Sequence, residues 1–255
     1  MNHVLAIARV TYREAVRNRV LYSLLFFVVV LLLVSGVLDS MTTGQNGRVV
    51  LDLGLAGVQL FGALIAMFLG VSAMSREVAR KTLYVVLAKP VGRTGFLLGK
   101  FLGLLATLGV LLAAMGGCLL LVAAVFGAAP SGQALLALAM MWLELGLIGA
   151  VALLFAVFTG PFLSGMFTLG VFCIGHLTPG LKALGRESGD AFIVALTQGV
   201  YYLFPNLDVF DFKTEALYRL PVSASGVGLA LVYGVAYTGA LLALAALLFK
   251  RRDFR

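Results

Sequence analysis

Long apolar runs dominate this chain, and they constrain its fold more than any other feature. Each has about 20 residues, the length that a helix needs to cross the hydrocarbon core of a bilayer. Hydrophobic residues make up 62% of the 255 residues and charged residues only 12%, well below the share in soluble domains. We therefore predict an all-α integral membrane protein with six transmembrane helices, over residues 20–38, 53–73, 101–126, 135–159, 162–180 and 226–249.

The Lys and Arg residues gather outside alternate apolar spans. Fourteen of the nineteen lie before the first span, between the second and third spans, or after the sixth span. Positive residues favour the cytoplasmic side of a membrane, so we expect both termini and the insert between spans two and three to be cytoplasmic. The expected location is a bacterial-type cytoplasmic (inner) membrane, with the chain multi-pass. The net charge of +8 is then explained by topology, and no nucleic-acid partner is expected.

The chain is expected to form a single transmembrane domain over residues 1–255. In residues 1–19, plotted as a helix, Arg9, Arg13 and Arg17 form a stripe beside an apolar arc. This pattern predicts an amphipathic helix in the cytoplasmic interface, with the arginines near anionic lipid headgroups. A solvated basic leader that only orients the first span is the alternative. Because this polar segment precedes the first apolar run, we expect no cleaved signal peptide.

Residues 181–221 are too polar to span, yet they are rich in Phe and Tyr. Aromatic residues of this kind concentrate at the depth of lipid headgroups. We predict a re-entrant outer segment of short helices, broken at Pro205 because proline cannot continue a helix. A plain extracellular loop is the alternative, and it explains the aromatic residues less well.

Residue patterns that carry catalysis are scarce. Ser164 and His176 are twelve residues apart in one predicted helix, about 18 Å along its axis, so they cannot form a catalytic pair. His3 and His176 are the only histidines, and no cysteine cluster accompanies them, so no metal site is expected. Gly99-Lys100 lacks the upstream glycine and the following Ser or Thr of a phosphate-binding loop. We expect no enzyme activity and no bound cofactor in this chain.

Glu144 is the one acidic residue well inside a predicted span. A carboxylate at this depth is costly, which makes it a functional candidate as a cavity-lining residue, a helix-pairing residue or a proton relay. The sequence shows no basic residue in the same membrane layer to pair with it. We therefore favour cavity lining or helix pairing over proton coupling.

The insert between spans two and three, residues 74–94, combines a basic helix with an ordered run of other residues. It begins with Arg76 and Glu77 and leads into Leu97-Leu98-Gly99-Lys100 at the third span. A positive-inside bias alone does not predict the ordered Thr-Leu, Lys-Pro-Val and Gly-Lys pattern. A docking surface for a cytoplasmic partner does explain it. Its candidate docking residues are Arg76, Glu77, Arg80, Lys81, Thr82, Leu83, Lys89 and Pro90.

This insert resembles the coupling helix of type-2 ABC exporter permeases, with Lys81 where family members usually carry Gly. The resemblance extends over the chain: a basic N-terminal helix, six spans, an aromatic outer segment containing residues 201–207, and a basic C-terminus. It implies a permease subunit that dimerises with a second copy, or with a related chain as a heterodimer. Two copies of a separate ABC ATPase subunit would bind beneath, carrying the ATP and Mg²⁺, and Glu77 would lie near Arg9 or Arg13.

Other classes of protein predict other patterns. A secondary transporter or channel that uses Glu144 predicts internal repeats and paired intramembrane charges, which the sequence does not show. A substrate-capture subunit of an importer also has about six spans, but it does not predict the basic insert. The resemblance therefore favours the permease of an ATP-driven exporter, with membrane lipid as its surroundings.

Overall fold

The computed structural model describes residues 2–41, 47–79, 92–128, 130–188 and 190–251. These residues form helices joined by short connections, and none of them is in a β-strand. The helices are α1 (Asn2–Val16), α2 (Arg19–Met41), α3 (Arg48–Ala79), α5 (Arg93–Val125), α6 (Gly132–Phe158), α7 (Pro161–Ser188), α8 (Ala191–Leu203), η1 (Asp208–Phe210), α9 (Lys213–Tyr218) and α10 (Ala224–Arg251).

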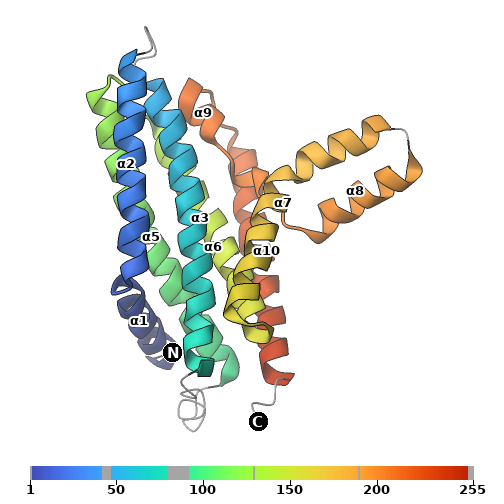
Figure 1. Ribbon diagram of the computed structural model, residues 1–255. Helices are drawn as coiled ribbons and strands as arrows, with labels where there is room; N and C mark the ends of the chain where they lie inside the picture. The colour runs from blue at the N-terminus through green and yellow to red at the C-terminus, as the bar shows by residue number, and fades with distance from the viewer. Residues whose placement is uncertain (1, 42–46, 80–91, 129, 189, 252–255) are drawn as a thin grey trace.

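Five of the described helices are long and apolar enough to cross a membrane: α3, α5, α6, α7 and α10. They match the second to sixth predicted spans. The predicted first span lies within α2, whose apolar stretch in the described residues is the shorter Val28–Val37. The chain is thus an all-helical, multi-pass membrane protein, and Figure 1 shows its two termini at the same end of the bundle.

Three predicted boundaries differ from the structure by about six to eight residues. The third span was expected to begin at residue 101, but α5 already begins at Arg93. The second span was expected to end at residue 73, but α3 continues to Ala79, so Arg76 and Glu77 belong to this helix. The fifth span was expected to end at residue 180, but α7 continues to Ser188. In all three places the helix continues beyond the predicted apolar run, because backbone hydrogen bonding does not require apolar side chains.

Helix α6 is the centre of the bundle. It packs against α3, α5, α7 and α10, and an unbroken run of its residues from Glu144 to Leu154 is buried. Its N-terminus is capped by Ser131, whose side chain accepts a hydrogen bond from the backbone N–H of Ala134 at 3.1 Å. A helix buried on all sides has no reason to be amphipathic, and α6 is apolar around its whole circumference apart from Gln133 in its first turn and Glu144.

Close contact between α3 and α6 depends on small residues. A Cβ atom at Gly70 would lie 2.5 Å from the Cβ of Ala152 and 3.0 Å from the backbone oxygen of Gly149. In a bilayer, burying apolar side chains between helices contributes little free energy, because the lipid tails are also apolar. Helices therefore associate through such close packing. This contact positions α3 against the central helix.

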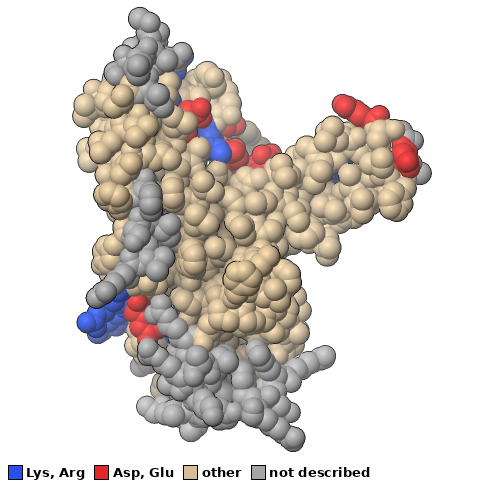
Figure 2. Space-filling model, in the orientation of Figure 1, with Lys and Arg blue, Asp and Glu red and all other residues tan. Residues whose placement is uncertain are grey.

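Helices α7 and α8 form a hairpin arm that projects from the side of the bundle (Figure 1). Pro179 lies within α7, and proline removes a backbone hydrogen bond and bends a helix. Helix α8 ends at Leu203, before Pro205. Its N-terminus is capped by Asp190, whose carboxylate accepts the backbone N–H of Phe192 at 2.8 Å. Figure 2 shows few charged side chains along the arm and acidic residues at its tip. The predicted outer segment 181–221 is therefore the end of α7 followed by α8, η1 and α9.

Candidate functional site

A buried polar cluster joins α3, α6 and α7. Glu144 on α6 is completely buried, and its Oε2 accepts a hydrogen bond from Nε2 of Gln59 on α3 at 2.9 Å. Nε2 of His176 on α7 lies 3.3 Å from Glu144 Oε1 and 3.0 Å from Gln59 Nε2. Because polar groups away from water are costly without partners, these three side chains stabilise one another.

Lys213 extends the cluster to α9, which Figure 1 places at the end of the bundle away from the termini. Its Nζ donates to Gln59 Oε1 at 2.7 Å and lies 3.1 Å from Asp211 Oδ2. Asp211 Oδ1 also accepts the backbone N–H of Lys213 at 3.0 Å, a local turn that starts α9. Gln59 is thus bonded both to the acidic group on α6 and to the cation on α9.

Residues 204–218, here called the covering segment, pack over this end of the bundle. The backbone N–H of Leu207 donates to Gly175 O at 3.1 Å, and the N–H of Asn206 donates to the hydroxyl of Tyr233 on α10 at 2.8 Å. A Cβ atom at Gly175 would lie 2.7 Å from Leu207 Cγ, so only glycine allows this approach. Phe210, which belongs to this segment, is completely buried. The covering segment is therefore held to α7 and α10 as well as to α3.

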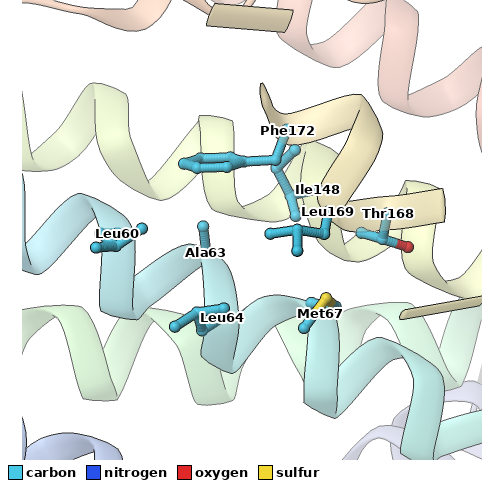
Figure 3. Close-up of a pocket in the computed structure, with 8 residues that line it drawn as sticks. All are labelled: Leu60, Ala63, Leu64, Met67, Ile148, Thr168, Leu169 and Phe172. Carbon is cyan, nitrogen blue, oxygen red and sulfur yellow. The ribbon is translucent and has the colours of Figure 1, made fainter. Parts of the chain in front are cut away.

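One turn from the cluster, toward the termini, lies a small apolar recess between α3, α6 and α7. Figure 3 shows the side chains that point into it. Ile148 follows Glu144 by one helical turn, and Phe172 precedes His176 by one turn. The recess is lined by Leu60, Ala63, Leu64, Met67, Ile148, Thr168, Leu169 and Phe172.

The arrangement favours charge and proton chemistry over bond cleavage. The Ser164 hydroxyl lies 2.6 Å from the Thr159 hydroxyl and donates to Gly160 O, while His176 contacts Glu144. Within the described part of the chain, no group of three or more His, Cys, Asp or Glu residues is placed to hold a metal ion. What the cluster can do is hold a proton or a compensated set of charges between helices.

A sequence model of the ABC-2 family transporter proteins matches residues 5–254, nearly the whole chain. The chain belongs to the ABC-2 transporter family. This ABC-2 permease is thus a membrane component of an ABC transporter, a role that is generally not itself catalytic and that implies partnership with an ABC ATPase subunit. A search of curated proteins found no match to it.

Most of the residues predicted to dock the ATPase lie outside the described part of the permease. These are Arg80, Lys81, Thr82, Leu83, Lys89 and Pro90. Arg76 and Glu77 fall in the last turn of α3, where the helix is described but their side chains are not. The expected approach of Glu77 to Arg9 or Arg13 therefore also involves a side chain outside the described part of the chain. The assignment of the insert stays a prediction.

The basic N-terminal helix is placed against the start of α5. Arg9, Arg13 and Arg17 are exposed, and Figure 2 shows basic side chains gathered at this end of the molecule. A Cβ atom at Gly99 would lie 2.8 Å from Ile7 Cβ, so glycine lets α1 pack closely on α5. Lys100, counted with the basic insert in the sequence, is buried here with its Nζ 3.9 Å from Glu14 Oε2.

The structure corrects one expectation about Glu144. The sequence offered it no basic partner, but His176 supplies one. Gln59 was not identified from the sequence, although a polar side chain inside a predicted span was a signal that could have found it. Lys213 gave no such signal, because it lies in a polar segment where a lysine is ordinary.

Proposed function

We propose that this chain is the permease subunit of an ATP-driven exporter, coupling ATP hydrolysis on a separate subunit to movement of a substrate across the membrane. The observation that carries the proposal is the family match over residues 5–254. The proposed assembly contains two permease chains, as a homodimer, and two ATPase subunits that hold ATP and Mg²⁺. Each permease has six spans, counting α2, with both termini in the cytoplasm of a cell with a bacterial-type inner membrane.

The proposed coupling path is α3. This helix runs unbroken from Arg48 to Ala79, so its end away from the termini carries Gln59 and its other end leads into the basic insert. A rigid helix pressed by a moving partner transmits that motion along its length. Closure of the ATPase subunits would thus shift α3 against the central helix α6 and against the covering segment.

Affinity purification of the chain in mild detergent, with mass spectrometry of the co-eluting proteins, tests the proposal. An ATPase subunit with a phosphate-binding loop, present in equal amount, is the expected result. A homogeneous chain that carries out proton- or sodium-driven uptake in liposomes without an ATPase would overturn the proposal. It would support the alternative, an ion-coupled secondary transporter, which the contact between the buried Glu144 and the partly buried His176 favours.

The docking residues can be tested in the same preparation. Reversing the charge in Arg80→Glu with Lys81→Glu is expected to reduce the co-purified ATPase more than about tenfold, since like charges placed across an interface cost several kcal/mol. Truncating Leu83→Ala should also weaken docking. Arg186→Glu, a reversal at an exposed arginine near the tip of the arm, is the matched control and should leave docking unchanged. Equal ATPase recovery from all variants would refute the docking assignment.

A further inference from the structure

The hydrogen bonds in the buried cluster determine where the protons lie at all but one position. Lys213 can only donate, so the atom of Gln59 that faces it is the acceptor Oε1. The amide nitrogen of Gln59 therefore faces Glu144 Oε2 and His176 Nε2, at 2.9 and 3.0 Å. The orientation of this amide is determined by the lysine on α9.

The orientation of the histidine is determined in a similar way. His176 Nδ1 lies 3.0 Å from the backbone oxygen of Phe172, which can only accept. Nδ1 must therefore carry a proton, and Nε2 is the ring atom whose state can change. Nε2 faces two groups, the amide nitrogen of Gln59 and Oε1 of Glu144.

Gln59 and Glu144 favour opposite protonation states of His176 Nε2. If Nε2 carries no proton, it accepts a hydrogen bond from Gln59, and Glu144 Oε1 stays without a partner. This oxygen is indeed buried without a hydrogen-bond partner among the described residues. If one proton lies between Nε2 and Oε1, the carboxylate is satisfied, and the second N–H of Gln59 loses its acceptor. A carboxylate oxygen buried in this way is costly, which favours proton uptake.

The charges around the pair also favour a bound proton. Glu144 is negative, while Lys213 and Asp211 offset one another at 3.1 Å, so the ionised cluster carries one negative charge in a medium of low dielectric constant. Of the other elements packed on α7, α8 contains no acidic or basic residue, and Asp208 of η1 is exposed. Glu215 of α9 has one oxygen, Oε2, that is also buried without a hydrogen-bond partner among the described residues.

We propose that Glu144 and His176 form a proton-binding site inside the membrane domain, and that Gln59 transmits its occupancy to Lys213 and the covering segment. When the proton is bound, Gln59 gives up its bond to His176, and its amide is held only by Glu144 and Lys213. Gln59 has then lost its contact with α7, so the amide that accepts from Lys213 on α9 is held in place less firmly. The site would make the attachment of the covering segment to this end of the bundle depend on pH.

Proton binding can be measured on this chain alone, because it contains only two histidines. In a His3→Gln background, ¹⁵N-histidine NMR of the full chain in lipid nanodiscs reports His176 alone. At about pH 5 to 6 we expect Nε2 to be protonated in the parent chain and unprotonated in Glu144→Gln. Glutamine has the same shape as glutamate and can still accept from Gln59, so this variant is expected to fold. Glu14→Gln, which removes a carboxylate from α1, is the matched control and should behave as the parent.

Transmission to the covering segment has its own readout. After correction for intrinsic exchange, amide hydrogen exchange in α9 should be about tenfold faster at low pH than at neutral pH, the effect expected from weakening a hydrogen bond to a charged group. Gln59→Met, which keeps the length of the side chain but neither hydrogen bond, should abolish this dependence on pH.

Either of two results would overturn the inference. One is an unprotonated Nε2 in the parent chain at about pH 5, or a protonated Nε2 in both the parent and Glu144→Gln. The other is a pH response of α9 that persists in Gln59→Met. Neither measurement involves an ATPase, so failure here leaves the proposed transport function standing.

Discussion

Helices α6 and α10 are about equally long and equally apolar, yet their surroundings are opposite. In their most apolar windows, 78% of the residues of α6 are buried inside the protein, against 17% of those of α10. In a membrane both environments are apolar, so composition cannot distinguish a helix packed among helices from one that faces lipid. The difference lies in packing, and the buried helix is the one that carries the intramembrane acid.

The largest expected effect is at that acid. Glu144→Ala should destabilise the chain by about 3–5 kcal/mol, because it removes the buried carboxylate that accepts from Gln59 and contacts His176, and it leaves an N–H of Gln59 without that acceptor. Glu14→Ala is the control, since Glu14 is half exposed and its contact with Lys100 is long, at 3.9 Å. It should cost less than about 1 kcal/mol. Reversible unfolding by SDS in mixed micelles, followed by the fluorescence of Trp142, the single tryptophan, measures both.

A smaller but still large effect is expected from apolar truncation in α6. Leu147 is completely buried, and Leu147→Ala should cost about 2–4 kcal/mol because it opens a cavity among close-packed helices. Leu229 on α10 is 70% exposed, and Leu229→Ala should change stability by less than about 0.5 kcal/mol. The same unfolding assay compares them. Equal losses would mean that α10 is buried against another chain, and the contrast between the two helices would apply only to the single subunit.

The smallest effects concern glycines. Gly70→Ala places a Cβ against α6 and should destabilise by about 1–3 kcal/mol through overpacking. A Cβ added at Gly239 in α10 would meet no neighbouring atom within 4 Å, so Gly239→Ala should stabilise the helix by up to about 1 kcal/mol. Thermal unfolding in nanodiscs checks the signs. A stabilising Gly70→Ala would show that α3 and α6 are less closely packed than the Gly70–Ala152 contact indicates.

Much of the fold could be predicted from the sequence because span positions depend on local properties. Apolar runs located the five long helices to within several residues, and Pro205 lies just beyond the end of α8. The extensions at the ends of α3 and α7 and at the start of α5 were missed, since the end of an apolar run is not the end of a helix. The side arm formed by α7 and α8 was not foreseen either, because its direction depends on how α7 bends.

The candidate site could be predicted only in part. Glu144 stood out because an acid in an apolar span is unusual, and that is a property of one residue in its local context. Its partners did not stand out, since Gln59 and Glu144 are 85 residues apart in the chain, and Gln59 and His176 are 117 apart. No local pattern relates residues at such separations when the helices between them can pack in several orders.

The sequence by itself determined that this chain is a helical membrane protein, where its helices lie, and which ends of them are basic. These features follow from the cost of exposing a backbone or a charge to lipid, a cost that each segment meets separately. Only the tertiary structure decided that α6 is central and that Glu144 meets His176 and Gln59. Those features depend on which helix faces pack together, and that choice is made by small residues and side-chain shape across the whole bundle.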